Sequence, residues 1–179
     1  MNKIYAGIGS RKTPDQVIKQ MMWLGEVLGN KGWTLRSGGA DGADLAFEDG
    51  CNNVGGLKEI YLPVPKFNKS DSPLFEIPKR AYALAKIYHP TYYGLGMFAK
   101  KCMARNVQQV LGPSLIGIAV NEQVDMIICW TPDGAENGED TTKETGGTGQ
   151  AIRVATDYEI PVFNLKNEDA LDRLTEFLK

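Results

Sequence analysis

The sequence predicts an α/β sandwich in which helices flank a mostly parallel central sheet. Two observations predict this class: short apolar runs alternate with amphipathic stretches, and glycine-rich turns follow directly after predicted strands. The composition, 42% hydrophobic and 23% charged, is close to that of ordinary globular proteins and permits a buried core. A length of 179 residues corresponds to about one domain, so we expect a single domain over residues 1–179.

The first predicted strand and helix have well-marked ends. The apolar run Ile4–Ile8 predicts a strand. Thr13 and Pro14 predict a helix start, with Thr13 as the N-cap, proline at the first helical position and Gln16 completing a capping box. Apolar residues then recur at helical spacing until Gly32, where we expect this helix to end.

The later elements follow from the same signals. Buried parallel strands show short continuous apolar runs, and helices show apolar residues every three or four positions. We expect strands at Trp33–Arg36, Glu59–Val64, Val124–Trp130 and Ile160–Asn164, and a loop at Lys66–Phe75. We expect helices from Gly42 to about Asn52, at Ile77–Tyr88 and at Met97–Leu111. Another helix should follow Thr145–Gln150, with Ala151, Ile152, Ala155 and Tyr158 on its inner face, and the last helix should lie at the C-terminus with Asn167 as its cap.

Three glycine-rich turns carry the main functional signal. Gly7–Arg11 follows the first strand, Ser37–Asp44 follows the second, and Thr145–Gln150 opens a later helix. The carboxyl ends of parallel strands share one edge of the sheet, where backbone amides and helix N-termini can bind a phosphate. Tight connections also use glycine without a ligand, so one such turn is a weak signal. Three turns at one edge favour a phosphate site.

Two carboxylates lie inside the second turn. Asp41 and Asp44 would repel a phosphate, so they suit the hydroxyl groups of a ribose better. The competing interpretation is structural, with Asp41 capping the next helix and Asp44 complementing its dipole. The sequence alone leaves both open.

The region between Glu76 and Glu122 contains no acidic residue but many cationic and aromatic ones. Such a segment can pair with phosphates and stack on bases, or it can form helices with a solvated basic face and an aromatic core. Within it, Asn106 follows Arg105 on an otherwise apolar stripe and needs a polar partner from the backbone or a ligand. The residues are Lys79, Arg80, Tyr82, Lys86, Tyr88, Tyr92, Tyr93, Phe98, Lys100, Lys101 and Arg105.

Two other features have weaker functional meaning. The acidic, glycine-containing segment Asp133–Glu144 predicts a mobile loop that either closes over a ligand or is merely solvated. His89 is the only histidine, and we expect a structural role because no Ser/His/Asp or Cys/His arrangement accompanies it.

Charge, cysteine usage and hydropathy exclude several classes. A net charge of −2 and an isoelectric point near 5.5 argue against nucleic acid as the main partner. Cys51, Cys102 and Cys129 form no CxxC pair, which is typical of reduced thiols and argues against a metal site. No apolar run approaches the ~20 residues that span a bilayer or resembles a signal peptide, so we expect a cytoplasmic protein without a membrane partner.

Five motifs together resemble a known family. They are Gly7–Arg11, Ser37–Asp44, Thr145–Ala151, Ala104-Arg105-Asn106 and Cys129–Gly134. The pattern is similar to the SLOG superfamily, which contains Smf DNA-processing proteins, LOG phosphoribohydrolases and YpsA-like proteins. It is most similar to small stand-alone members, some of them phage-encoded. The resemblance implies a Rossmann-like three-layer sandwich with five or more parallel strands and a pocket for nucleotides or nucleotide-derived signals.

One motif departs from the enzymes of this family. LOG enzymes cleave a nucleoside monophosphate with a PGGxGTxxE segment whose glutamate is catalytic. In the corresponding stretch Thr145 replaces the proline, Gln150 the threonine and Arg153 the glutamate. A glycosidic hydrolase needs a carboxylate, which Asp41, Asp44 or Glu48 would have to supply.

We therefore expect a protein that binds a phosphorylated nucleotide or a nucleotide-derived signal, such as an ADP-ribose-like or cyclic nucleotide, for sensing or sequestration. A phage-encoded protein would act in the host cytoplasm and deprive a defence system of its messenger. The alternatives are an N-glycosidic hydrolase and a single-stranded DNA-binding protein. We expect a homo-oligomer, no metal and no cofactor beyond the bound nucleotide. The expected ligand contacts are Gly9, Ser10, Arg11, Ser37, Gly38, Gly39, Asp44, Arg105, Asn106, Thr131, Gly146, Gly147, Thr148 and Gln150.

Overall fold

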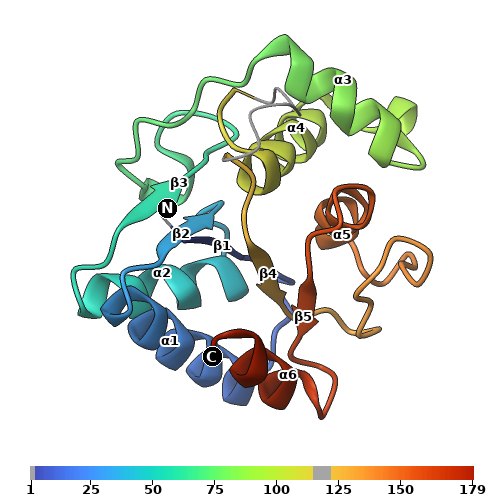
Figure 1. Ribbon diagram of the computed structural model, residues 1–179. Coiled ribbons are helices and arrows are strands. Elements are labelled where there is room, and N and C mark those ends of the chain that lie inside the picture. Colours follow the sequence, from blue (N-terminus) through green and yellow to red (C-terminus); the bar gives the residue numbers. More distant parts are fainter. Residues whose placement is uncertain (1–2, 115–121) are drawn as a thin grey trace.

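The computed structural model describes residues 3–114 and 122–179, and these contain a five-stranded, all-parallel sheet (Figure 1). The strand order is β3-β2-β1-β4-β5. The chain therefore winds outward from β1 in one direction and then returns to β1's other side. The strands are β1 (Ile4–Gly7), β2 (Thr34–Ser37), β3 (Lys58–Ile60), β4 (Met126–Cys129) and β5 (Val162–Asn164).

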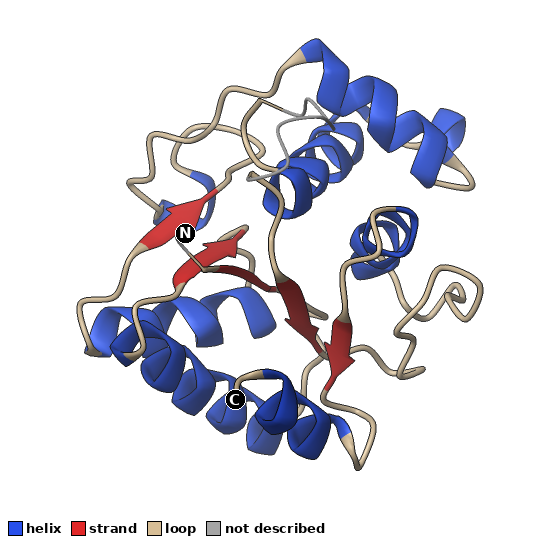
Figure 2. Ribbon diagram, viewed as in Figure 1, coloured by secondary structure: helices blue, strands red, loops and turns tan. Residues whose placement is uncertain are grey.

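Helices cover both faces of the sheet, which confirms the three-layer α/β class (Figure 2). One face is covered by α1 (Asp15–Asn30), α2 (Ala43–Asn53) and α6 (Ala170–Phe177), and the other by α3 (Lys79–Tyr88), α4 (Met97–Leu111) and α5 (Thr148–Asp157). Two short 3-10 helices, η1 (Phe67–Lys69) and η2 (Tyr92–Gly94), lie in the connections.

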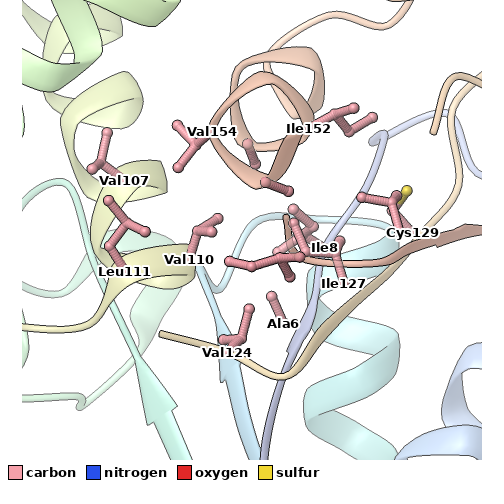
Figure 3. Packing of buried hydrophobic residues seen from close by; sticks show 14 of the residues in the cluster. Ala6, Ile8, Val107, Val110, Leu111, Val124, Ile127, Cys129, Ile152 and Val154 are labelled. Atoms are coloured by element: carbon pink, nitrogen blue, oxygen red, sulfur yellow. The ribbon is translucent and has the colours of Figure 1, made fainter. Parts of the chain in front are cut away.

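The core has two halves because successive residues of a strand face opposite sides of the sheet. Tyr5 of β1 contacts Trp33 and Phe47 edge-to-face, with ring centroids 6.4 and 6.1 Å apart. The neighbouring Ala6 lies in the other half, against α4 and α5 (Figure 3). That half includes Ile8, Val107, Val110, Leu111, Val124, Ile127, Cys129, Ile152 and Val154.

Two predicted helix caps are wrong. Thr13 is not the N-cap of α1: its hydroxyl donates to the Ser10 carbonyl at 2.7 Å, and Pro14 is the N-cap, without the expected capping box. Asn167 does not cap α6, because its side-chain amide donates to the Gly134 carbonyl at 3.0 Å. In both cases a contact to a loop competes with the local cap.

The strand β3 is shorter than the predicted Glu59–Val64. The N–H of Tyr61 still bonds to the Ser37 carbonyl, but the N–H of Leu62 bonds to Leu74 outside the sheet. The prolines that follow have no N–H to continue a ladder. Within residues 3–114 and 122–179, no helix has the length and apolar character needed to span a bilayer.

Candidate functional site

A cleft of about 1010 Å³ opens at the carboxyl-terminal edge of the sheet. It lies where the connections after β1, β2 and β4 meet α4 and the start of α5, which is where parallel sheets of this kind bind ligands. Its lining residues are Ile8, Gly9, Ser10, Arg11, Lys12, Ala40, Asp44, Cys102, Met103, Arg105, Asn106, Gln109, Pro132, Lys143, Glu144, Thr145, Gly146, Gly147 and Thr148.

The first glycine-rich turn forms one wall of the cleft. A Cβ atom on Gly9 would lie 2.8 Å from Cβ of Ala43 and 2.9 Å from the carbonyl oxygen of Trp130, so close packing requires glycine here. The Ser10 N–H donates to the same carbonyl at 3.0 Å and fixes the turn against β4. Arg11 follows on the exposed rim.

Asp44 lies at the inner end of the cleft and is only 4% exposed. Its Oδ2 accepts from the Ala40 N–H at 3.4 Å and lies 3.6 Å from Nη1 of Arg105. Burial raises the pKa of Asp44, while Arg105 and the N–H groups of Ala40, Gly38 and Gly9 lower it, and the net shift is upward. The second turn therefore directs a backbone N–H, that of Ala40, at the protein's own carboxylate.

Arg105 reaches the same point from α4. A Cβ on Gly38 would lie 1.1 Å from Nη1 of Arg105, so Gly38 is a glycine because the guanidinium packs across it. Nη1 also approaches the Tyr61 carbonyl at 3.5 Å. Among the described residues, the buried Nε of Arg105 has no hydrogen-bond partner.

The third turn forms the opposite wall and begins α5. The Asn106 side-chain amide donates to the Gly147 carbonyl at 3.2 Å, which supplies the polar partner that its position demands. Within the described part of the chain, the N–H groups of Gly147 and Thr148 have no hydrogen-bond acceptor, as is usual for the first turn of a helix. This helix N-terminus is therefore open toward the cleft.

The segment Asp133–Glu144 is more organised than its composition predicts. Asp133 accepts hydroxyl hydrogen bonds from Thr131, Thr142 and Thr145. Burial alone would raise the pKa of Asp133, but these hydroxyls outweigh it and hold the pKa well below its usual range. The hydrogen bonds hold the end of the loop, which includes Lys143, against the cleft.

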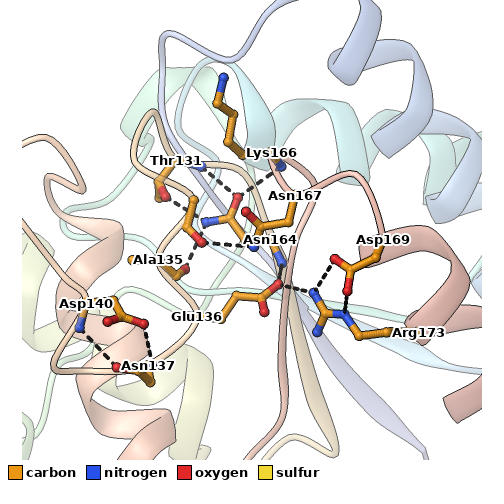
Figure 4. A network of polar contacts seen from close by, with 11 residues as sticks. Thr131, Ala135, Glu136, Asn137, Asp140, Asn164, Lys166, Asn167, Asp169 and Arg173 are labelled. Atoms are coloured by element: carbon orange, nitrogen blue, oxygen red, sulfur yellow. Dashed lines mark hydrogen bonds and ion pairs between the residues drawn. The ribbon is translucent and has the colours of Figure 1, made fainter.

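A buried asparagine that the sequence did not single out supports this loop (Figure 4). Asn164 is 0% exposed, and its side-chain amide donates to the hydroxyl of Thr131 at 2.7 Å and to the carbonyl of Ala135 at 2.9 Å. Its backbone N–H donates to Glu136, which also pairs with Arg173 at 2.8 Å. Asn164, at the end of β5, thus holds the loop through both its side chain and its backbone N–H.

Nine of the expected ligand contacts lie together in the cleft, and their binding role stays a prediction. They are Gly9, Ser10, Arg11, Asp44, Arg105, Asn106, Gly146, Gly147 and Thr148.

Other expected contacts lie outside the cleft lining. The Ser37 hydroxyl is fully buried and donates to the Gly7 carbonyl at 2.7 Å. Gly38 lies under Arg105, and Gly39 presents its carbonyl to the Asn68 side chain at 3.1 Å. These three residues hold the turn, and their direct contact with a ligand stays a prediction.

Thr131, Gln150 and Asp41 also lie outside the lining. Thr131 is fully buried and bonded to Asp133, and the Gln150 side chain donates to the Met103 carbonyl at 2.8 Å. Asp41 accepts from Asn68 at 2.9 Å on the exposed side of the turn. Of the two carboxylates in the second turn, only Asp44 faces the cleft.

Arg153 occupies the position of the LOG glutamate and has a structural role. Its Nε donates to the Tyr88 carbonyl at 2.7 Å and its Nη1 to the Thr141 hydroxyl at 2.6 Å. It does not line the cleft. The sole histidine, His89, accepts at Nδ1 from the Thr91 N–H at 3.3 Å, away from the lining.

Several lining residues were missed by the sequence interpretation. Cys102 and Gln109 lie three residues before and four residues after Arg105, so helical spacing could have found them. Lys12 follows Arg11 directly. Lys143 was indicated only as part of the segment Asp133–Glu144, which was expected either to close over a ligand or to be solvated, and the hydrogen bonds of Asp133 hold that segment beside the cleft.

Proteins of known structure share the fold of this chain, although its sequence matches no known family. No known family profile and no curated protein matches the sequence. The structure is similar to DNA processing protein A from Helicobacter pylori, which binds single-stranded DNA, at 19% identity, with 98% of this chain and 72% of that chain covered and a TM-score of 0.53. It is also similar to DNA processing protein A from Streptococcus pneumoniae, at 17% identity, with 98% of this chain and 56% of that chain covered and a TM-score of 0.50. The molybdenum cofactor carrier protein of Chlamydomonas reinhardtii is similar at 15% identity, with 99% of this chain and 85% of that chain covered and a TM-score of 0.49.

The chain has a Rossmann-like α/β fold that it shares with these DNA processing proteins, as predicted. At these identities the similarity concerns the fold alone, and it does not bear on a phage source.

Proposed function

We propose that the protein binds a phosphorylated nucleotide or a nucleotide-derived signalling molecule in this cleft, with the phosphate at the N-terminus of α5. The observation that carries the proposal is the open helix start at Gly146, Gly147 and Thr148, which faces a cleft large enough for a nucleotide. Unpaired N–H groups and the helix dipole both favour an anion at this position.

Cationic side chains support the same placement. Arg11 and Lys12 lie on the wall formed by the first turn, and Lys143 lies beside the third turn. All three are exposed, so they can reach a phosphate without being desolvated beforehand. Their charge would also speed the encounter with an anionic ligand.

The proposed use of binding is sensing or sequestration. Arg153, at the position of the LOG glutamate, is held by Tyr88 and Thr141 outside the cleft, so the LOG reaction has no carboxylate at its usual place. Binding alone needs none.

Calorimetry with AMP, cyclic AMP, ADP-ribose and NAD tests the proposal. We expect one of these ligands to bind, and Arg11→Glu to weaken that binding about tenfold or more because it replaces an attractive charge at the phosphate by a repulsive one. Lys19→Glu, which makes the same charge change on the exposed side of α1, is the matched control. No heat with any ligand would contradict the proposal.

A second candidate function is N-glycosidic hydrolysis by Asp44. Burial raises the pKa of Asp44, which suits a general acid, and this carboxylate lies in the cleft. Chromatography would detect free base released from AMP, and Asp44→Asn should abolish the release. An inert wild-type protein would rule this function out.

Single-stranded DNA is a third candidate, favoured by an exposed surface of lysines and aromatic rings. Lys86 lies 5.1 Å from the ring centroid of Tyr93, and Phe98 is half-exposed at the start of α4. Such surfaces stack bases. Because counterions are released on binding, DNA affinity should fall steeply with salt, and a gel shift insensitive to salt would contradict this candidate.

A further inference from the structure

The inner end of the cleft already contains an anion, the carboxylate of Asp44. Its Oδ2 accepts from the Ala40 N–H at 3.4 Å, and the residue's exposed fraction is 4%. A phosphate placed here would lie against the Asp44 carboxylate, which repels it. The two ends of the cleft therefore differ in the chemistry they accept.

Arg105 leaves a hydrogen-bond donor unused at the same end. Its side chain is 7% exposed, its Nη1 lies 3.6 Å from Oδ2 of Asp44, and its Nε has no partner among the described residues. A buried donor without an acceptor destabilises the unliganded protein. Nε itself is shielded from the cleft, so a ligand oxygen would accept instead from the terminal nitrogens of the Arg105 guanidinium.

A hydroxyl group satisfies both side chains at once. It can donate its proton to Asp44 and accept a hydrogen bond from Arg105. A phosphate oxygen would be repelled by Asp44, and an ammonium group would be repelled by Arg105. Neighbouring sugar hydroxyls match the pair best, and carboxylates that bind ribose hydroxyls are common in nucleotide-binding folds.

We propose that Asp44 and Arg105 bind the ribose hydroxyls of the ligand, so that the cleft selects ribonucleotides over nucleotides that lack these hydroxyls. This inference rests on the proposed function, because it assumes the phosphate at the start of α5 and the sugar at the inner end. It also assigns Asp44, and not Asp41, as the residue that determines sugar specificity.

Calorimetry with matched ligands tests the inference on the wild-type protein. The probes are AMP, GMP, CMP and UMP and the dideoxy form of each. We expect the dideoxy form of any nucleotide that binds to bind about tenfold or more weakly, because hydrogen bonds to two charged groups are lost. Equal affinity for the two forms would overturn the inference while leaving the proposed function intact. Absence of binding by all four monophosphates would overturn the inference, and the proposed function fails as well only when cyclic AMP, ADP-ribose and NAD also give no heat.

The variant Asp44→Asn tests whether the preference for the ribose form depends on the Asp44 carboxylate. Asparagine has nearly the same shape but no charge, so we expect the preference for the ribose form to fall by about threefold or more. Asp41→Asn, outside the cleft on the same turn, should keep the wild-type preference. Circular dichroism checks that Asp44→Asn is folded, and an unchanged preference in the folded variant would overturn the inference. Should the variant not fold, the comparison on the wild-type protein decides alone.

Discussion

At the residue scale, Asp44 determines what the inner end of the cleft can accept. Two glycine-rich turns end beside Asp44, whose carboxylate accepts from the Ala40 N–H and places a negative charge there before any ligand arrives. Arg105 balances the charge from α4. The anion site that remains open is the start of α5, where Gly147 and Thr148 keep free N–H groups in the described structure. The glycine pattern alone predicts an anion at both ends, and only the side chains distinguish them.

Adding a single methyl group at Gly38 should disturb the cleft. A Cβ atom there would lie 1.1 Å from Nη1 of Arg105 and 2.7 Å from Nε2 of Gln109. We expect Gly38→Ala to displace Arg105, to lower the free energy of unfolding by about 1–3 kcal/mol and to weaken nucleotide binding. Urea denaturation and calorimetry measure the two effects. Gly94→Ala is the control, since no atom lies within 4 Å of its added Cβ. A Gly38→Ala protein as stable as wild type would contradict this packing.

Asp133 should stabilise the fold in a pH-dependent way. We expect Asp133→Asn to lower the free energy of unfolding by about 1–3 kcal/mol at neutral pH, because hydrogen bonds to a charged acceptor weaken. The folded-state pKa of Asp133 lies below the ordinary carboxyl value. Its contribution is therefore present above the unfolded-state pKa of about 3.9 and is lost as pH falls through the lower folded-state pKa.

Urea denaturation of wild type and Asp133→Asn at several pH values measures this difference. It should be constant near neutral pH and shrink below about pH 4. Asp172→Asn, on the exposed face of α6, is the control. A difference that persists unchanged in acid would contradict the role given to the Asp133 carboxylate.

At the element scale, α5 connects the cleft to the core. Its first turn lines the cleft, and its apolar face packs on the sheet and on α4, so the helix carries the proposed phosphate site on a buried support. Ala151, Ile152 and Ala155 lie inside as the periodicity predicted, whereas Tyr158 is only partly buried at the helix end. The loop before α5 is held separately, by Asp133 and Asn164.

Replacing Ile152 should show how much the packing of α5 on the sheet contributes to the free energy of unfolding. Its side chain is 0% exposed in the half of the core between the sheet and α5. We expect Ile152→Ala to lower the free energy of unfolding by about 2–5 kcal/mol, because burial is lost and a cavity remains. Urea denaturation measures it. Ile87→Ala makes the same chemical change at a side chain that is 72% exposed, and it should cost about 0.5 kcal/mol or less. Equal effects of the two changes would contradict the assigned burial.

At the scale of the whole molecule, the alternation of apolar runs and amphipathic stretches was sufficient to predict the sheet and its helices. Strands buried on both faces, such as Met126–Cys129, leave a local signature in the sequence. Element ends were less predictable, because Thr13 bonds back to the Ser10 carbonyl in the turn before α1, and Asn167 bonds to the Gly134 carbonyl in a loop distant in the sequence. The site was also only partly predictable. Its turns could be predicted from their glycines, but the contact of Gly38 with Arg105 could not, because these residues lie far apart in the sequence.

Ligand binding should raise the stability of the whole molecule. A ligand that binds only the folded state at about one hundred times its Kd contributes about 2.7 kcal/mol. For a chain of this size we therefore expect the nucleotide identified by calorimetry to raise Tm by about 5–10 °C. Differential scanning calorimetry measures the shift, and adenosine without phosphate is the control. A Tm that does not move under these conditions would contradict specific binding to the folded state.

The packing of Arg105 across Gly38 also restricts how this chain can diverge. A side chain at position 38 would collide with the guanidinium where it now lies, so a descendant that gains one there must move, shorten or lose the arginine. A descendant that loses the arginine leaves Asp44 without its counter-charge. The three positions are therefore expected to change in a fixed order or together, and a laboratory selection for altered ligand preference should recover them as linked substitutions.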